Sequence, residues 1–316
     1  MSSSVVPAVE ETATDIAEME IRGAATIARA AARAVCTQAV ETDATDAATL
    51  RAEVRVAARR LHATRPTAVS LPNALRYVLD RMEGEDPEAV RESVVAASEE
   101  FRARLDRAQA DLGAVGANRL GDGDTVMTHC HSTDVLSCIE AARDQGKSLS
   151  AVVKETRPRK QGHITAGRLR ELDVPVTLVV DGAAHRYLDE VDHVFVGADS
   201  IAADGSVVNK IGTSGLAVLA RERDTPVVVA AATLKLDPAT LSGATVDIET
   251  REESEVLPTD ERAEVGDVSV ANPAFDVTPP RYVDAIVTER GQFPPESIVV
   301  LMRELYGTDP STPWEE

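Results

Sequence analysis

The feature that most constrains the fold is a regular alternation of short apolar runs and helical segments, which begins at Gly121. Apolar, β-branched runs predict strands over residues 125–129, 151–154, 176–181, 193–197, 226–232, 245–248 and 284–288. Helices are predicted between or after these runs, near residues 133–145, 163–172, 213–223 and 296–306. Strands and helices that alternate in this way form a parallel, doubly wound sheet, so the predicted fold class is α/β.

The chain before Gly121 contains no strand pattern and is predicted to be helical. Helices are expected over residues 15–40, 44–61, 71–81 and 86–112. Gly23 lies inside the first of these segments and marks a fresh helix start, and Gly113 follows the last as a stop signal. The 316 residues therefore predict two domains, a helical one over residues 1–120 and an α/β one over residues 121–316.

The charge of the chain narrows its partners. Asp and Glu number 53 against 33 Lys and Arg, a formal charge of −20, which argues against binding to nucleic acid or to an anionic membrane. Lys is scarce, at positions 147, 154, 160, 210 and 235, and aromatic residues are few. This balance indicates a cytosol of high salt, where screening reduces self-repulsion. GC-biased codon usage with ordinary acidity is the alternative explanation.

Targeting and cysteine patterns point to the cytoplasm. The N-terminal residues have no basic segment followed by an apolar one, and no run of 18 apolar residues occurs, so we expect neither export nor a membrane span. The three Cys residues form no C-x-x-C pair, which predicts neither a disulfide framework nor a zinc site. We expect a reducing, cytoplasmic setting.

Two motifs follow predicted strands directly. Cys130 comes after the run that ends at His129, and Asp199 comes after the run over residues 193–197. In open α/β sheets the ligand crevice lies outside the carboxyl ends of the strands, so a thiol and a carboxyl group would meet there as an acid/base pair. A metal on His129 and His131, a Cys nucleophile with a His base, and a purely structural Cys are the alternatives. Because side chains alternate along a strand, both His side chains are expected to face away from that of Cys130.

Several basic residues are candidates for phosphate binding. Arg22, Gly23 and Ala24 lie at a possible helix start, where backbone N–H groups and a guanidinium attract anions. Arg65 lies in an extended segment before Pro66, and Asn209 and Lys210 precede the helix start at Gly212. Taken singly, the first two are also compatible with a small residue at a packing contact and with a surface Arg.

Lys235 is a further candidate because it follows the apolar run 226–232 at the same predicted sheet edge. We expect its ammonium group to face the crevice and to bind the second of two phosphates.

An ordered set of motifs resembles the family of initiation factor 2B α/β/δ subunits and sugar-1-phosphate isomerases over about residues 18 to 306. The set comprises Arg22-Gly23-Ala24, Arg65 to Ala68, Thr128-His129-Cys130, Glu155 to Pro158 with Gln161-Gly162, Gly197-Ala198-Asp199, Asn209 to Thr213, and Asn272 to Pro280. Within the family the chain is most similar to the archaeal branch that converts α-D-ribose 1,5-bisphosphate to D-ribulose 1,5-bisphosphate. That branch feeds a ribulose-bisphosphate carboxylase in nucleotide (AMP) salvage.

The resemblance implies roles for individual residues. Cys130 would be the catalytic base and Asp199 the proton donor, with no metal and no cofactor. Substrate contacts would come from Arg22, Gly23, Ala24, Arg65, His131, Ser132, Thr133, Asn209, Lys210 and Lys235. The resemblance also implies a helical N-terminal domain, a Rossmann-like catalytic domain and a homo-oligomer, a hexamer built as a trimer of dimers. It is compatible with a nucleotide, AMP, as activator.

The chemistry of such a substrate sets two requirements. A sugar phosphorylated at its anomeric oxygen needs an acid at the ring oxygen and a base at the C2 proton. For Asp199 to act as the acid near neutral pH, burial must raise its pKa above the usual value of about 4. For Cys130 to act as the base, Lys210 or helix N-termini must lower a thiol pKa that is ordinarily about 8.5. Hydride transfer from C2 to C1 stays open as another route.

Two other functions are compatible with the family. A non-catalytic regulatory subunit would bind a nucleotide or a translation factor through the same pocket, but it needs no acid/base pair. Methylthioribose-1-phosphate isomerases typically carry a Gly-rich insertion after His-Cys-Asn. Here His131 replaces that Asn, and residues 133–145 run directly into a predicted helix, which counts against that substrate.

Overall fold

The computed structural model describes residues 5–65, 67–307 and 312–315. The chain forms two compact units, one from Met1–Ala108 with Tyr306–Glu316 and one from Gln109–Leu305. The boundary expected at residue 120 therefore lies at residue 108 instead, inside a long helix, and the C-terminal residues belong to the first unit.

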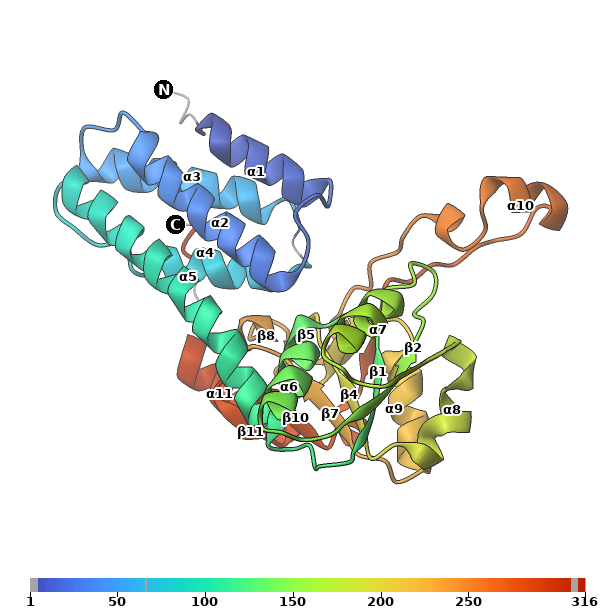
Figure 1. Cartoon of the computed structure of the whole chain (residues 1–316). Coiled ribbons are helices and arrows are strands. Elements are labelled where there is room, and N and C mark those ends of the chain that lie inside the picture. Colours follow the sequence, from blue (N-terminus) through green and yellow to red (C-terminus); the bar gives the residue numbers. More distant parts are fainter. Residues whose placement is uncertain (1–4, 66, 308–311, 316) are drawn as a thin grey trace. The chain divides into compact units, whose positions relative to one another are not determined.

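The first unit is helical, as expected (Figure 1). It contains α1 (Pro7–Ala17), α2 (Ala24–Glu41), α3 (Ala47–His62), α4 (Ser70–Leu79) and the first part of α5 (Pro87–Ala117). The helix expected over residues 15–40 is two helices, and the predicted start at Gly23 is confirmed: this residue is the N-cap of α2, with a φ of 87°. The C-terminal segment joins this unit because Trp314 stacks on His62, with ring centroids 4.9 Å apart.

The stop predicted at Gly113 is wrong, because α5 continues to Ala117. A side chain at position 113 would approach the backbone oxygen of Ser137, in α6 (Thr133–Asp144), to 2.7 Å. Gly113 thus serves close packing of α5 against α6, a role that its sequence position does not distinguish from a helix stop. No helix in the described part of the chain is both long and apolar enough to cross a membrane.

The second unit is built on a seven-stranded sheet in the order β11-β10-β7-β4-β1-β2-β3. The strands are β1 (Thr125–His129), β2 (Ser150–Lys154), β3 (Val176–Val179), β4 (His193–Val196), β7 (Val227–Ala230), β10 (Ala285–Thr288) and β11 (Gly291–Phe293). All neighbours pair in parallel except β11, which pairs antiparallel with β10. The six parallel strands have the order of the Rossmann fold, with the chain reversing direction across the sheet between β1 and β4.

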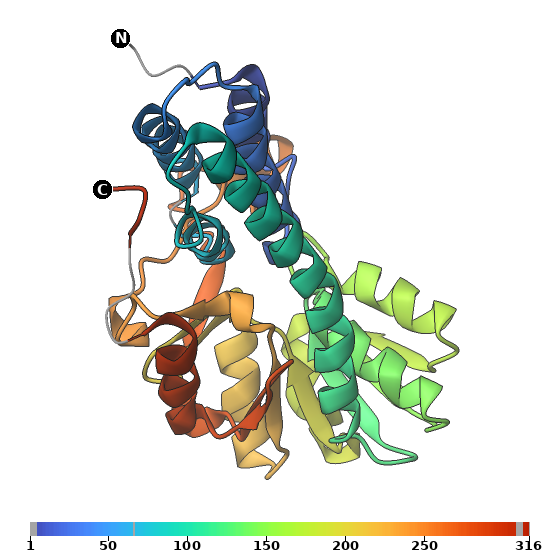
Figure 2. The same cartoon turned by 90° about the vertical axis from the view of Figure 1, so that its left-hand side faces the viewer.

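Helices cover both faces of this sheet (Figures 1 and 2). On one face α6, α7 (Gly162–Glu171) and the end of α5 surround an apolar core that includes Leu112, Cys138, Ile139 and Leu169. On the other face α8 (Ala184–Tyr187) contacts α9 (Thr213–Glu222). Another helix, α11 (Ile298–Tyr306), follows β11 in the chain.

A second, four-stranded sheet was not predicted. It contains β8 (Leu236–Asp237), β5 (Ser200–Ala202), β6 (Val207–Lys210) and β9 (Phe275–Thr278), in that order. These strands have two to four residues each, which is too short for an alternating pattern to stand out.

The strand predicted over residues 245–248 is also wrong. The chain there leaves the short 3-10 turn Gly243–Thr245 and enters a loop. A long connection follows, with a second 3-10 turn at Glu253–Glu255 and the helix α10 (Thr259–Val265), before β9 begins (Figure 1). Further 3-10 turns lie at Asp181–Ala183, Leu188–Glu190, Thr233–Lys235, Pro280–Tyr282 and Pro295–Ser297.

Candidate active site

Cys130 and Asp199 lie on the two sides of the point where the strand order reverses. Cys130 follows β1 directly, and Asp199 follows β4 after Gly197 and Ala198. In doubly wound sheets this point opens a crevice between the diverging loops. Gly197 allows the loops to approach, because a Cβ atom there would meet the Ser132 side chain at 2.5 Å. The topology thus places the thiol and the carboxyl group where a ligand crevice is expected.

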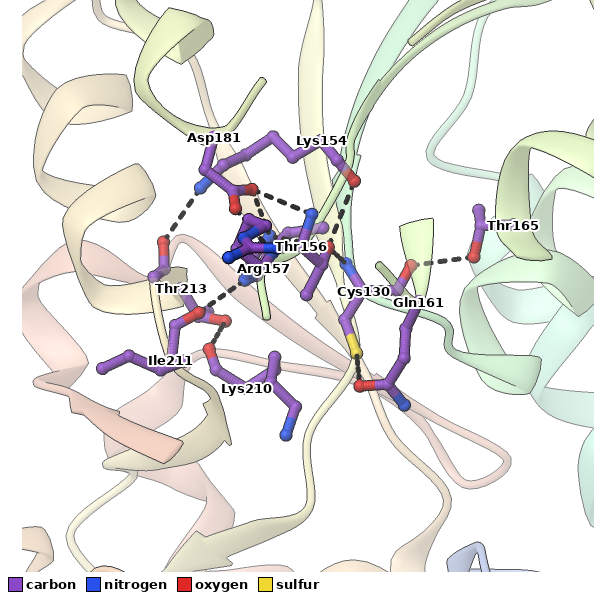
Figure 3. Close-up of polar contacts among 12 residues, drawn as sticks. Cys130, Lys154, Thr156, Arg157, Gln161, Thr165, Asp181, Lys210, Ile211 and Thr213 are labelled. Carbon is purple, nitrogen blue, oxygen red and sulfur yellow. Dashed lines mark hydrogen bonds and ion pairs between the residues drawn. The ribbon is translucent and has the colours of Figure 1, made fainter. Parts of the chain in front are cut away.

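Cys130 is held by three side chains, two from the loop between β2 and α7 and one from α7 (Figure 3). Its backbone N–H donates to Thr156 Oγ1 at 2.8 Å, and its carbonyl accepts from Thr165 Oγ1 at 2.8 Å. Its thiol donates to Gln161 Oε1, with a sulfur–oxygen distance of 3.5 Å. Cys130 also has a left-handed backbone, with a φ of 70°, a conformation that persists only where the surroundings fix it. The thiol is therefore fixed in place and protonated.

The hairpin of β5 and β6 brings Asp199 close to Lys210. The backbone N–H of Asp199 donates to the Val208 carbonyl at 2.8 Å, and Ser200 pairs with Val208. Lys210 ends β6, and its ammonium group lies 4.7 Å from the centre of the Phe275 ring on β9. Four residues before the start of α9, the buried Asn209 donates its amide to Thr213 Oγ1 at 3.0 Å. The two short strands therefore bring Asp199, Asn209 and Lys210 close together.

Cys130, Asp199 and Lys210 influence one another's charge. Burial raises the pKa of the Cys130 thiol to about 11; the Lys210 ammonium opposes this shift, whereas the Asp199 carboxylate adds to it. Burial also lowers the pKa of Lys210, and the Cys130 and Asp199 charges counteract that effect. As expected, the charge of Lys210 lowers the pKa of the Cys130 thiol. The thiol pKa is nevertheless raised, contrary to the expectation, because the desolvation of the thiol outweighs the effect of Lys210.

The surroundings expected for Asp199 are also different. The preceding residues, from Val194 to Ala198, are buried, but Asp199 itself is exposed at the crevice. The strand that leads to Asp199 lies in the core, whereas its side chain lies beyond the strand end. Residues 194–198 therefore do not shield this carboxyl group from solvent.

His129 and His131 have separate structural partners. His129 is 1% exposed, and its Nε2 lies 2.8 Å from the Ile211 carbonyl, which can only accept, so Nε2 carries the proton. Burial lowers the pKa of His129 to about 4, which keeps the ring neutral. His131 Nδ1 lies 3.0 Å from Thr165 Oγ1. Since that hydroxyl donates to the Cys130 carbonyl, it accepts from His131. Neither ring contacts the thiol, and no group of three or more metal-binding side chains occurs among the described residues.

The predicted contacts Ser132, Thr133 and Lys235 lie around the start of α6. Ser132 is the N-cap and accepts from the Val135 N–H, and Thr133 is the first helical residue. The ammonium group of Lys235 forms a 2.8 Å ion pair with Asp134, in the first turn of the same helix. Both side chains of this pair are largely buried. Lys235 thus adjoins the helix N-terminus, but its partner in this structure is a carboxylate of the chain itself.

The four remaining candidates belong to the first unit. Arg22 and Gly23 are exposed, and Ala24 is the first residue of α2. The first-turn N–H groups of this helix therefore come directly after Arg22 and Gly23 in the chain. Arg65 is half-buried in a loop. Pro66, which motivated the extended conformation predicted for Arg65, lies outside the described residues.

A basic pocket next to Lys210 was missed by the sequence interpretation. It is lined by Thr156, Arg157, Pro158, Arg159, Gln161, Lys210, Ile211, Arg251, Glu255, Asn272, Pro273 and Ala274. Arg159 forms a bidentate pair with Glu255, and Arg251 pairs with Glu249 at 2.8 Å. The motifs Glu155 to Pro158 with Gln161-Gly162, Asn209 to Thr213 and Asn272 to Pro280 contain most of the lining residues, whereas Arg251 and Glu255 come from a loop without any pattern.

Comparison with known proteins agrees with this architecture. The sequence matches the initiation factor 2 subunit family over residues 20–295. It is 70% identical over 316 residues to a Haloferax volcanii protein named ribose 1,5-bisphosphate isomerase, covering 100% of this chain and 98% of that one. A Haloterrigena turkmenica protein of the same name is 64% identical over 319 residues, with 98% of each chain covered.

A solved structure also supports the assignment of the chain to this family. The 5-methylthioribose 1-phosphate isomerase of Pyrococcus horikoshii superposes with a TM-score of 0.78 at 32% identity, covering 95% of this chain and 88% of that one. The family match extends over both the helical segment from residue 20 and most of the α/β unit. On this sequence and structural similarity, the chain belongs to the initiation factor 2 subunit family.

Proposed function

We propose that the chain isomerises α-D-ribose 1,5-bisphosphate to D-ribulose 1,5-bisphosphate, in nucleotide (AMP) salvage that feeds a ribulose-bisphosphate carboxylase. The observation that carries this proposal is identity of 64–70% over essentially the whole length to two proteins named ribose 1,5-bisphosphate isomerase. The site is compatible with it, since a thiol and a carboxyl group face a crevice that Lys210 makes more positive.

In the proposed reaction Cys130 acts as the base and Asp199 as the acid. Asp199 gives a proton to the ring oxygen, which opens a ring whose anomeric oxygen carries a phosphate. The Cys130 thiolate removes the C2 proton, which gives an enol with a C1=C2 double bond. The C2 hydroxyl then gives its proton to the Asp199 carboxylate while the Cys130 thiol returns a proton to C1, so the ketone forms at C2 and both side chains regain their starting protonation states. The ammonium of Lys210 stabilises the thiolate that this step needs, because it acts against the desolvation that keeps the thiol protonated.

The resemblance to the family leads us to propose Arg22, Gly23, Ala24 and Arg65 as substrate contacts. In the second unit we assign Asn209 and Lys210 to one phosphate and the sugar. We assign His131, Ser132, Thr133 and Lys235 to the other phosphate, because the first-turn N–H groups of α6 and the Lys235 ammonium lie together. The substrate phosphate would then compete with Asp134 for Lys235.

The experiment is to incubate the purified chain, in molar KCl, with three sugar phosphates in parallel: ribose 1,5-bisphosphate, ribose 1-phosphate and methylthioribose 1-phosphate. Ketose formation is followed by NMR. We expect conversion of the bisphosphate at a kcat/KM at least tenfold above that of either monophosphate, the discrimination expected for about 1.4 kcal/mol. Faster conversion of methylthioribose 1-phosphate would assign the other isomerase activity, and no conversion of any of them would favour a regulatory subunit.

The resemblance to the family also leads us to propose a cytoplasmic homo-oligomer, a hexamer built as a trimer of dimers, with AMP as an activator. Light scattering after gel filtration measures the mass directly. Titration of AMP into the isomerase assay measures activation, and an unchanged rate at saturating AMP would contradict that part of the proposal.

A further inference from the structure

Lys154 is a buried cation that the proposed mechanism does not use. It is the last residue of β2 and is only 4% exposed, although it lies at the sheet edge next to the crevice. Its ammonium group donates to the Gly212 carbonyl at 3.3 Å. Burying an ammonium group is costly unless partners compensate, so a position like this one requires a reason.

The charges around Lys154 come from three other elements. Burial lowers the pKa of Lys154, and the carboxylates of Asp181, in the turn after β3, and Asp276, on β9, oppose this shift. His129, its register partner on β1, is kept neutral by its burial and by Lys154. The ammonium thus lies between two carboxylates and beside a neutral ring, an arrangement that stabilises one buried positive charge.

The two carboxylates fix loops of the site. Asp181 accepts from the N–H groups of Thr156, at 3.0 Å, and Arg157, at 2.7 Å. Asp276 accepts from the N–H groups of Gly212, at 2.7 Å, and Ser214, at 3.1 Å. Through these contacts Asp181 holds the segment whose Thr156 binds the Cys130 backbone, and Asp276 holds the start of α9.

Lys154 and His129 reach the same short segment from neighbouring strands. His129 donates to the Ile211 carbonyl and Lys154 to the Gly212 carbonyl, so two consecutive carbonyls that follow Lys210 are bound from β1 and β2. His129 precedes Cys130 in the chain, and Lys210 precedes Ile211. The two contacts therefore connect the ends of β1 and β2 to the segment that begins at Lys210.

We propose that Lys154 is a positioning residue, which with His129 ties the Lys210–Gly212 segment to the strand end that carries Cys130 and so keeps Lys210 beside the thiol. Lys154 does not touch the substrate in this account. It acts through Lys210, whose charge favours the thiolate, and through the segments that Asp181 and Asp276 hold. The catalytic part of this inference rests on the proposed function, whereas its effect on the thiol does not.

The test is the substitution Lys154→Met, which removes the ammonium group and retains a side chain of similar length. The matched control is Lys147→Met, because Lys147 also donates to a backbone carbonyl, that of Ala117, at 2.7 Å, away from the site. Two quantities are measured: the pH dependence of Cys130 alkylation by iodoacetamide, resolved from Cys36 and Cys138 by peptide mass spectrometry, and kcat and KM for ribose 1,5-bisphosphate.

Lys154→Met is expected to move Cys130 alkylation to higher pH and to lower kcat on the order of 10- to 100-fold, the range for misplaced catalytic groups, with a smaller change in KM. Lys147→Met is expected to change neither. An alkylation profile and a kcat equal to those of Lys147→Met would overturn the proposal. A shifted profile in a chain that converts no sugar phosphate would support the positioning role and contradict the proposed function.

If Lys154→Met does not fold, Lys154→Gln keeps an N–H donor without the charge. It is expected to shift the alkylation profile in the same direction, because the cation between the two carboxylates is lost. An unshifted profile in folded Lys154→Gln, with folding checked by circular dichroism, would equally overturn the role assigned to the ammonium group.

Discussion

Cys130 is a protonated thiol in the free protein, and its reactivity depends on a balance of neighbours. Burial raises the thiol pKa to about 11, while Lys210 pulls it down and Asp199 pushes it up. The hydrogen bond to Gln161 Oε1 orients the sulfur and is made by the thiol rather than the thiolate. The backbone N–H of His131 and the ammonium group of Lys210 are therefore the groups that favour a thiolate at this position.

This balance predicts opposite effects for two substitutions. In Asp199→Asn a negative charge is removed, so the pKa of Cys130 falls and its alkylation by iodoacetamide moves to lower pH. In Lys210→Met a positive charge is removed, and alkylation moves to higher pH. The measurement is the rate of Cys130 modification against pH in both variants. Shifts in the same direction would show that these charges do not control the thiol.

The assignment of Lys235 to the second phosphate predicts that its removal weakens the binding of two ligands to different extents. If it binds the second phosphate, Lys235→Ala weakens binding of ribose 1,5-bisphosphate by about 1.5–3 kcal/mol, the range for a hydrogen bond to a charged group, and leaves ribose 1-phosphate nearly unaffected. Calorimetric titration of both ligands measures this difference. Equal losses would mean that Lys235 acts only as the partner of Asp134.

Among the elements, those that the sequence predicted well are the ones with enough buried apolar residues to form a pattern. The predicted strand over residues 125–129 has the bounds of β1, and the other five parallel strands are placed within a few residues. The carboxyl edge of the sheet could therefore be located, and with it Cys130 and the loop that ends at Asp199.

The elements and contacts that the sequence did not predict were missed for physical reasons. The β5–β6 hairpin, which joins Asp199 to Lys210, consists of strands too short to alternate visibly. Lys154 was read as the end of an apolar strand, because nothing in a single sequence shows that Asp181 and Asp276 surround its ammonium group. Arg251 and Glu255 reach the pocket only through a long, patternless loop.

The contact between β1 and the start of α9 predicts a sensitivity to acid. The pKa of His129 is about 4 in the folded chain and about 6.5 when unfolded. The stability that comes from the neutral ring is thus complete above pH 6.5 and is lost as the pH falls toward 4. Between about pH 7 and about pH 5 this loss amounts to roughly 2 kcal/mol.

The variant His129→Gln isolates this effect, because Gln keeps an N–H donor for Ile211 and does not titrate. Urea unfolding midpoints at the two pH values are expected to fall less in His129→Gln than in the parent chain. His62 and His131, whose pKa values are also lowered by burial, remain in both proteins and serve as the internal reference. An equal fall in both proteins would contradict the burial of a neutral His129.

At the scale of the whole molecule, the formal charge of −20 predicts dependence on salt. Screening shortens the range of repulsion between surface carboxylates to about 3 Å in molar salt, so the melting temperature and the activity are expected to rise with KCl into the molar range. Differential scanning calorimetry across a KCl series measures the first. A melting temperature that does not change between low and molar KCl would contradict adaptation to high salt.

The central claim is that one thiol and one carboxyl group, brought to the reversal point of the sheet, perform the isomerisation. The most direct test is to measure the turnover of ribose 1,5-bisphosphate by the parent chain, Cys130→Ser and Asp199→Asn, with folding checked by circular dichroism. The account predicts that each variant stays folded and loses activity by at least about 10², the usual effect of removing a general acid or base. Near-normal turnover by either folded variant would contradict it.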